Sequence, residues 1–241
     1  MPTPTPTPAP TPGPNTTGTG RFERVAHRGS PRERTENTLP GFLLAIDHGA
    51  DAIELDVHAT RDGEVVVHHD EAVQRRVIAQ STWRELAEID LGDGDRIPRL
   101  RDVFETVGNR AAVYVELKGR GIEDVVIDVA RTHGSRFALH SFDHDAIARV
   151  AQKAPDLARG ILLDRGIPKA ADQLRRAVER AQPRDVWPHW TLVNEQFMGV
   201  AHELGTRVIV WTVNSPGTAG ILVSLGVNGI CTDDVQILAN L

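Results

Sequence analysis

Short apolar segments alternate along the chain with longer segments whose apolar residues recur at helical spacing. The short segments are rich in Val and Ile, which is typical of buried parallel strands. In the longer segments the apolar residues gather on one face, as amphipathic helices require. Strands are predicted at residues 24–26, 52–57, 65–67, 112–117, 137–139, 160–163, 208–211 and 227–231. Helices are predicted at residues 38–48, 122–131, 143–153, 170–181, 194–204, 216–225 and 235–241.

This alternation predicts an α/β fold with a parallel sheet and right-handed crossovers. About eight strand–helix units fill residues 21–241, at about 28 residues each, which is close to the size of one such pair. Eight units favour closure into a (β/α)8 TIM barrel over an open sheet. Residues 71–99 interrupt the rhythm, because they are polar and contain two Gly and one Pro. We therefore expect a small insertion after the second barrel strand.

The first 20 residues differ from the rest of the chain, with seven Pro, seven Thr and no charged side chain. Such a composition cannot form a core, so residues 1–20 are expected to be a disordered Pro/Thr-rich tail on a single barrel domain at 21–241. An inert tail is the simplest interpretation. A ligand for a Pro-binding module, or a glycosylated stalk in an exported chain, are the alternatives.

Charge and cysteine content exclude several classes of protein. The chain has 33 acidic and 27 basic side chains, and this net charge of −6 argues against a nucleic-acid partner. Cys231 is the one cysteine, which excludes an intrachain disulfide framework and a Cys-rich zinc site. No apolar run reaches the roughly 18 residues of a membrane span, and the start of the chain lacks the pattern of a secretory signal. We expect a cytoplasmic protein without stable membrane insertion, and its oligomeric state stays open.

Charged residues interrupt two apolar strands near their carboxyl ends, where (β/α)8 barrels carry their chemistry. Glu54 and Asp56 have the same parity on one strand, so they face the same side. Glu116 and Lys118 do the same on another strand. Three carboxylates beside one Lys form an oxygen-rich site suited to one divalent cation, Mg²⁺ or Ca²⁺. The alternative is that each carboxylate forms an ion pair with an Arg across the barrel.

Two histidines, His27 and His69, follow predicted strands beside further polar residues. Imidazole titrates near neutral pH and suits proton transfer. Arg28 and Lys118 favour an anion, since Arg binds phosphate oxygens with two hydrogen bonds and Lys adds a point charge. His58 shares parity with the two carboxylates of its strand and is expected near the site. The set indicates a phosphoryl group held beside a cation and two acid–base groups.

At this point the ordered motifs resemble those of the glycerophosphodiester phosphodiesterase family, over about residues 22–234. A lone His-Arg-Gly would be weak, but the ordered set is highly specific. The motifs are Ala-His-Arg-Gly at 26–29, Glu-Asn-Thr at 36–38, Gly-Ala-Asp-Ala-Ile-Glu-Leu-Asp-Val at 49–57, Thr-Arg-Asp-Gly at 60–63, Val-Val-His-His-Asp at 66–70, Ile-Pro-Arg-Leu at 97–100, Tyr-Val-Glu-Leu-Lys at 114–118, Ser-Phe at 141–142, Trp-Thr-Val-Asn at 211–214 and Gly-Ile-Cys-Thr-Asp at 229–233.

The resemblance implies metal-dependent hydrolysis of a small-molecule glycerophosphodiester to sn-glycerol 3-phosphate and an alcohol. The free hydroxyl beside the phosphodiester would attack phosphorus, and water would then open the resulting cyclic phosphate. The resemblance assigns the cation to Glu54, Asp56 and Glu116. It assigns His27 and His69 as general acid and base, without saying which is which.

The resemblance also implies that Arg28 and Lys118 hold the phosphate. Trp211 would shape the pocket for the glycerol or the head group, and Glu36 would support Arg28. One departure from the family pattern is that residues 34–38 have no Pro before Glu-Asn-Thr, which affects loop stiffness and not chemistry.

Two other functions remain open. The first is a lysophospholipase D-like or other phospholipid phosphodiesterase of the same superfamily. Such an enzyme would need a lipid-binding surface, and we expect no exposed aromatic cluster or amphipathic anchor in this chain. The second is a non-catalytic barrel that binds phosphodiesters, against which the intact histidines and carboxylates argue.

Overall fold

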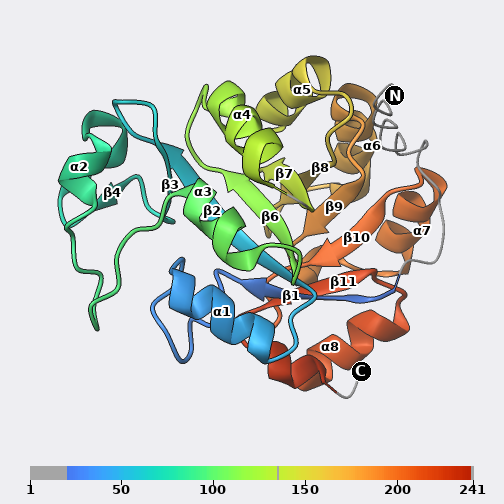
Figure 1. The fold of residues 1–241 in the computed structure, drawn as a ribbon. Helices are drawn as coiled ribbons and strands as arrows, with labels where there is room; N and C mark the ends of the chain where they lie inside the picture. The colour runs from blue at the N-terminus through green and yellow to red at the C-terminus, as the bar shows by residue number, and fades with distance from the viewer. Residues whose placement is uncertain (1–20, 135, 240–241) are drawn as a thin grey trace, which may run out of the picture.

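The computed structural model describes residues 21–134 and 136–239, so the expected tail at 1–20 lies outside the described residues. Eight parallel strands follow one another around a closed barrel (Figure 1). The first strand pairs with both the second and the last, which closes the sheet. The barrel strands are β1 (Glu23–His27), β2 (Ala52–Ala59), β6 (Ala112–Leu117), β7 (Phe137–Ser141), β8 (Arg159–Leu163), β9 (Asp185–Pro188), β10 (Arg207–Val210) and β11 (Gly229–Thr232).

The predicted (β/α)8 barrel is confirmed, but one of its eight strands was wrongly assigned. Residues Val65–Val67 form β3, which pairs antiparallel with the end of β2 and stands outside the barrel. The place in the barrel belongs to β9, which the sequence pattern missed. Its four residues begin with Asp185 and end with Pro188, so no Val- or Ile-rich run marks it. Asp185 is tolerated there because Arg184 and Arg207 form ion pairs with its carboxylate.

Helices cover the outside of the barrel, one between each pair of successive strands. They are α1 (Leu39–Asp47), α3 (Leu100–Val107), α4 (Glu123–His133), α5 (His144–Lys153), α6 (Ala170–Ala181), α7 (Glu195–Glu203) and α8 (Pro216–Ser224). The sequence pattern missed α3, which buries Leu100, Val103, Phe104 and Val107 but begins directly after the irregular insertion. The expected C-terminal helix is instead a short 3₁₀ turn, η3 (Val235–Leu238). The last two residues of its predicted range lie outside the described chain.

Local sequence explains where the helices start. The Thr38 hydroxyl accepts a hydrogen bond from the Gly41 amide at the beginning of α1, and Pro40 lies in the first turn. The Ser215 hydroxyl does the same for the Thr218 amide at the beginning of α8. Such caps satisfy amide groups that have no partner within the helix. These caps fix the residue at which each of these two loops, at the carboxyl end of the barrel, ends and its helix begins.

Two apolar cores sit on the two sides of the barrel wall. The larger one lies between strands and helices and contains Leu55 and Leu117, which point outward as their parity predicts. The smaller one fills the barrel interior. It consists of Val25, Ala52, Tyr114, Ala138, Leu162, Trp187, Ile209 and Cys231. This interior layer forms the floor on which the polar residues of the strand ends rest.

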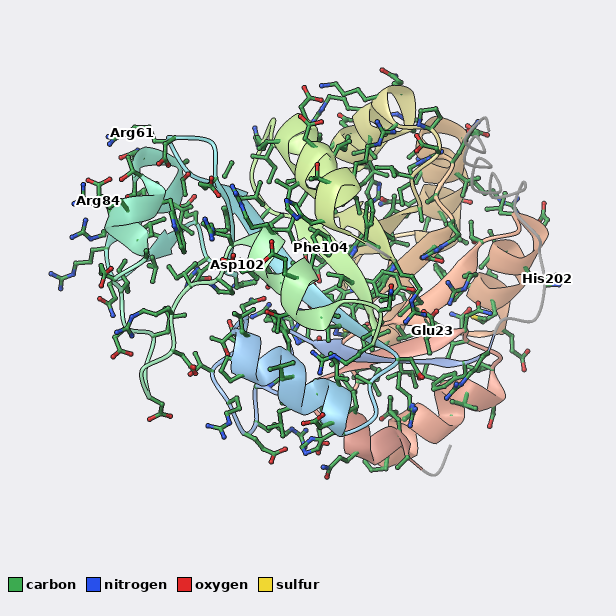
Figure 2. The ribbon with its side chains drawn as sticks, in the orientation of Figure 1. Glu23, Arg61, Arg84, Asp102, Phe104 and His202 are labelled. Atoms are coloured by element: carbon green, nitrogen blue, oxygen red, sulfur yellow. The ribbon has the colours of Figure 1, made fainter. Side chains whose placement is uncertain are left out.

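The insertion projects to one side of the barrel (Figure 1). It contains β3, β4 (Ala72–Val73), β5 (Arg76–Val77), η1 (Ile78–Gln80) and α2 (Trp83–Leu86). A separate small core holds it together, formed by Val66, Val73, Ile78, Leu86, Ile89 and Ile97. Arg61 and Arg84 lie at its outer end, far from the barrel (Figure 2). His69 therefore follows an insertion strand and not a barrel strand. In the described part of the chain, no helix has the length and apolarity needed to cross a bilayer.

Candidate active site

A cavity of about 170 Å³ opens at the carboxyl ends of the barrel strands. Each barrel strand, or the loop that follows it, contributes at least one residue to its wall. The lining residues are His27, Arg28, Glu54, His69, Glu116, Lys118, Phe142, Leu162, Trp187, Trp211 and Cys231. Seven of the eight site residues expected from the sequence therefore meet here. The eighth, Asp56, is completely buried and forms ion pairs with two of these lining residues.

The three carboxylates are buried, and two of them, Asp56 and Glu116, pair with cationic side chains. Lys118 Nζ lies 2.8 Å from Glu116 Oε1 and 3.2 Å from Asp56 Oδ1. Arg28 Nε lies 3.1 Å from Asp56 Oδ2. Asp56 and Glu116 thus form ion pairs, as the alternative interpretation of the sequence expects, although Lys118 takes part as well as an Arg, whereas Glu54 has no Lys or Arg ion pair among the described residues.

The pKa values of Asp56 and Glu116 are pushed in opposite directions. Burial opposes ionisation of Asp56, but the positive charges of Lys118 and Arg28 outweigh it and lower the pKa of Asp56. Burial dominates for Glu116, and the nearby negative charges of Asp56 and Glu54 add to it, so the pKa of Glu116 rises to about 8. These shifts favour the ionised form of Asp56 and the protonated form of Glu116.

Glu54, Glu116 and His140 bring one potential ligand atom each within 4.8 Å of one another. All three are buried, and two carboxylate oxygens with an imidazole nitrogen suit a divalent cation. His140 is the penultimate residue of β7 and was not among the residues singled out in the sequence. The residues present therefore fit a cation at this place. Asp56 lies beside this cluster, because it is the residue of β2 that pairs with Glu116 of β6.

His27 is held by the carboxylate of Asp233, the residue directly after the last barrel strand. Its Nδ1 lies 2.6 Å from Asp233 Oδ1, and Asn214 Nδ2 donates to the other oxygen of Asp233 at 2.6 Å. Burial disfavours the imidazolium form, but the hydrogen bond to Asp233 and the charge of Glu54 outweigh it, so the pKa of His27 is raised. An imidazole that uses Nδ1 in this way presents Nε2 for proton transfer.

His69 has a comparable but more exposed arrangement. Its Nδ1 lies 2.8 Å from Asp70 Oδ1. His58, buried as its parity predicts, donates from Nε2 to the backbone oxygen of His69 at 3.2 Å and so supports the loop. Burial lowers the pKa of His58, which keeps it neutral. His58 is thus a structural neighbour of the site and not a lining residue.

The loop after β1 places Arg28 by an unusual backbone path. Arg28 has a φ of +53° and Gly29 a φ of +91°. A Cβ on Gly29 would lie 2.8 Å from the carbonyl carbon of Gly41, so only Gly fits. Arg28 Nη1 donates to both oxygens of Glu36 at 3.2 Å, the contact expected from the sequence. Asn37 Nδ2 donates to Asp56 Oδ2 at 2.9 Å, which ties this loop to the carboxylates.

Aromatic side chains from three loops gather around Trp211. Phe142 packs against it edge-on with ring centroids 5.3 Å apart, and His189 does so at 5.4 Å. Trp190 follows at 5.6 Å from His189. Phe142 and Trp190 are each 40% exposed, so an exposed aromatic cluster exists and the sequence-based expectation of none was wrong. Its members are far apart in the sequence, and only the barrel brings them together. We call these four residues the aromatic rim.

A parallel barrel with two histidines, buried carboxylates, an Arg and a Lys at its carboxyl ends defines a class of enzyme that acts on anionic esters. The family model described as Glycerophosphoryl diester phosphodiesterase family matches residues 27–237. The chain belongs to this family and is an enzyme, a phosphoric diester hydrolase.

Individual relatives agree with this assignment. The glycerophosphodiester phosphodiesterase of Caldanaerobacter subterraneus subsp. tengcongensis is 32% identical over 237 residues, which cover 90% of this chain and 96% of the relative. A solved phosphodiesterase of Oleispira antarctica, in complex with the product sn-glycerol-3-phosphate, is 25% identical with a TM-score of 0.82 and covers 90% of this chain and 95% of its own. A human lysophospholipase D is 35% identical over 114 residues, or 40% of this chain and 36% of the relative.

Proposed function

We propose that this enzyme hydrolyses glycerophosphodiesters to sn-glycerol 3-phosphate and an alcohol. The observation that carries the proposal is the meeting of His27 and His69 with Arg28, Lys118 and the carboxylates in one cavity. The Oleispira antarctica phosphodiesterase, bound to sn-glycerol-3-phosphate, supports the same product for this chain.

In the proposed reaction, the free hydroxyl beside the phosphodiester attacks phosphorus. A new P–O bond forms, and the bond from phosphorus to the leaving alcohol breaks. One histidine takes the proton of the attacking hydroxyl, and the other gives a proton to the leaving oxygen. Water then opens the cyclic phosphate, with the two histidines in reversed roles. We assign His27 as the first acid, because its hydrogen bond to Asp233 raises its pKa and so favours the protonated form.

Arg28 and Lys118 bind the phosphoryl oxygens and hold the substrate between the histidines. Glu54, Asp56 and Glu116 are the proposed residues for one divalent cation, Mg²⁺ or Ca²⁺ on their oxygen chemistry alone. When bound, the cation would offset the negative charge that develops on the phosphoryl oxygens.

Hydrolysis is tested with glycerophosphocholine as substrate and ³¹P NMR as readout. We expect sn-glycerol 3-phosphate to accumulate, a cyclic phosphate to appear transiently, and chelation with EDTA to stop turnover until a cation is restored. Full activity after exhaustive chelation would exclude the cation. Binding of glycerophosphodiesters without any turnover would identify a non-catalytic barrel.

The aromatic rim favours a second candidate, a lysophospholipase D activity. Exposed aromatic rings beside a catalytic cavity offer an apolar surface for an acyl chain, and the human relative named lysophospholipase D matches part of this chain. Phe142→Ala and Trp190→Ala should then raise KM for lysophosphatidylcholine several-fold and change that for glycerophosphocholine little. Ile221→Ala removes an exposed apolar side chain of α8 and serves as control. Equal effects on both substrates, or none, would exclude a lipid-binding rim.

A further inference from the structure

His140 is a buried imidazole without a hydrogen-bond partner. It is 1% exposed, and neither Nδ1 nor Nε2 has a hydrogen-bond partner among the described residues. Its ring lies flat on that of Trp187, with centroids 4.7 Å apart and planes 6° apart, which fixes its orientation. A polar group buried without a partner is costly. Such a group beside two carboxylates that line the cavity, Glu54 and Glu116, indicates a ligand that the protein itself does not supply.

The register of the sheet aligns His140 with the carboxylates. Along the hydrogen-bonded strands, Asp56 is paired with Glu116, and Glu116 is paired with His140. The three residues thus form one row across β2, β6 and β7 and have the same orientation relative to the barrel. His140 Nε2 lies 3.8 Å from Glu54 Oε1, which is too far for a hydrogen bond. Both atoms are instead close enough to share a third partner between them.

We propose that His140 is a nitrogen ligand of the divalent cation at Glu54 and Glu116. The inference rests on the cation of the proposed function and adds to it a donor that the sequence did not indicate. A neutral imidazole has one nitrogen free to bind a cation and needs no loss of charge to do so. The stacked Trp187 ring fixes the plane of the His140 ring, in which Nε2 lies 3.8 Å from Glu54 Oε1.

A nitrogen donor changes which cation the site prefers. Ca²⁺ and Mg²⁺ take oxygen ligands, whereas imidazole suits first-row transition-metal cations, with Mn²⁺ at the weak end of that series and Ni²⁺ and Zn²⁺ further along it. We therefore expect His140 to strengthen binding of Mn²⁺ more than binding of Ca²⁺. The oxygen ligands alone would leave the site with the Mg²⁺ or Ca²⁺ preference expected from the sequence.

The test compares His140→Gln with the native enzyme after removal of bound metal by chelation. Isothermal titration with Mn²⁺ and with Ca²⁺ gives the affinities, and pulsed EPR of the Mn²⁺-loaded enzyme reports ¹⁴N coupling from a coordinated imidazole. We expect Mn²⁺ affinity to fall at least about tenfold, a loss that even an outer hydrogen-bond partner of a ligand can cause. Ca²⁺ affinity should change much less, and the ¹⁴N signal should disappear in the variant.

His144→Gln is the matched control, because its imidazole donates to the backbone oxygen of Leu162 at 2.9 Å and is outside the cluster. It should keep both the Mn²⁺ affinity and the ¹⁴N signal. Unchanged Mn²⁺ affinity in His140→Gln, or a ¹⁴N signal that persists there, would overturn the proposal. If His140→Gln does not fold, the EPR measurement on the native enzyme is sufficient, because Mn²⁺ bound without ¹⁴N coupling would also overturn the proposal. Native enzyme that binds no divalent cation at all refutes the cation of the proposed function instead.

Discussion

Replacing Asp233 by Asn tests the acid–base assignment of His27 most directly. The substitution keeps the size of the side chain but removes the charge that faces Nδ1 at 2.6 Å. It also creates a conflict, because Asn214 Nδ2 already donates to the other oxygen of Asp233. An amide can accept with its oxygen on one side only. If that oxygen faces Asn214, the amide nitrogen faces His27 and stabilises the wrong tautomer.

The size of the effect follows from the contact itself. His27 and Asp233 are 19% and 28% exposed, so solvent screens the pair only in part. A hydrogen bond to a charged group contributes about 1.5–3 kcal/mol, and about 1.4 kcal/mol corresponds to one pH unit in a pKa. Asp233→Asn should therefore lower the pKa of His27 by about 1–2. As less of the acid remains protonated at neutral pH, kcat should fall roughly 10- to 100-fold.

The assay is the pH dependence of kcat together with NMR titration of the His27 ring. If His27 is the acid, activity falls as pH rises through its pKa, and this limb should move to lower pH in Asp233→Asn. Asp70→Asn is the matched change beside His69, and its effect should be smaller because Asp70 is 72% exposed. An alkaline limb that stays in place, with the His27 resonance unmoved, would refute the assignment.

The same substitution makes a separate prediction for stability. A histidine whose pKa is raised on folding stabilises the protein below its unfolded value of about 6.5, and this stabilisation disappears as pH rises through the folded pKa. The native enzyme should therefore exceed Asp233→Asn in Tm most clearly below about pH 6.5, and the gap should narrow as pH rises through the raised pKa of His27. A constant gap across this range would mean that the loss is one of packing and not of the His27–Asp233 pair.

Three further outcomes are expected. His27→Ala and His69→Ala should each lower kcat by roughly 10²–10⁴-fold, and the double variant should lose much less than the product of the two, because the residues act as a unit. Retention of a tenth of the activity would exclude either residue. Affinity for the cation should rise with pH up to about 8, because binding should release a proton from Glu116. Calorimetry in buffers of different ionisation enthalpy measures this proton release, and pH-independent binding would contradict it. Gly29→Ala should lower the free energy of unfolding by well over about 1 kcal/mol. The loss should exceed that of Gly63→Ala, because Gly63 also has a positive φ but open space around it. Equal losses in denaturant unfolding would show that the contact with Gly41 is harmless.

The sequence predicted the fold because the strands of a barrel are buried on both faces and therefore carry continuous apolar runs. The two errors in strand assignment, the false barrel strand at 65–67 and the missed β9, have the same origin. The run at 65–67 is as apolar as a barrel strand, and only its antiparallel pairing with β2 places it outside. Strand β9 has no such run. Its Asp185 forms ion pairs with Arg184, directly before β9, and with Arg207, the first residue of β10. Apolar periodicity reports burial and is silent on the direction in which a strand pairs.

That the candidate residues would meet was predictable where strand parity or a motif placed them, as for Glu54 and Glu116, which line one cavity. Contacts between distant segments were not. Asp233 is 206 residues from His27, and its motif gave no hint of the partner. His140 stands at a strand end, but its relation to Glu116 depends on register, which the sequence does not specify. The aromatic rim likewise depends on three loops converging at one end of the barrel.

The arrangement of charges predicts that the proposed cation and the substrate affect each other's binding. Asp56 already pairs with Arg28 and Lys118, and the raised pKa of Glu116, about 8, favours its neutral form. A divalent cation at the proposed site would require ionised Glu116, so its binding would release a proton and compete with the Lys118 ammonium for the carboxylate that now lies 2.8 Å away. Lys118 would then have donors free for a phosphoryl oxygen, while its ion pair and that of Arg28 with Asp56 would hold both at the cavity wall. Because a phosphate restores the charge balance that the cation disturbs, the two ligands should each strengthen binding of the other.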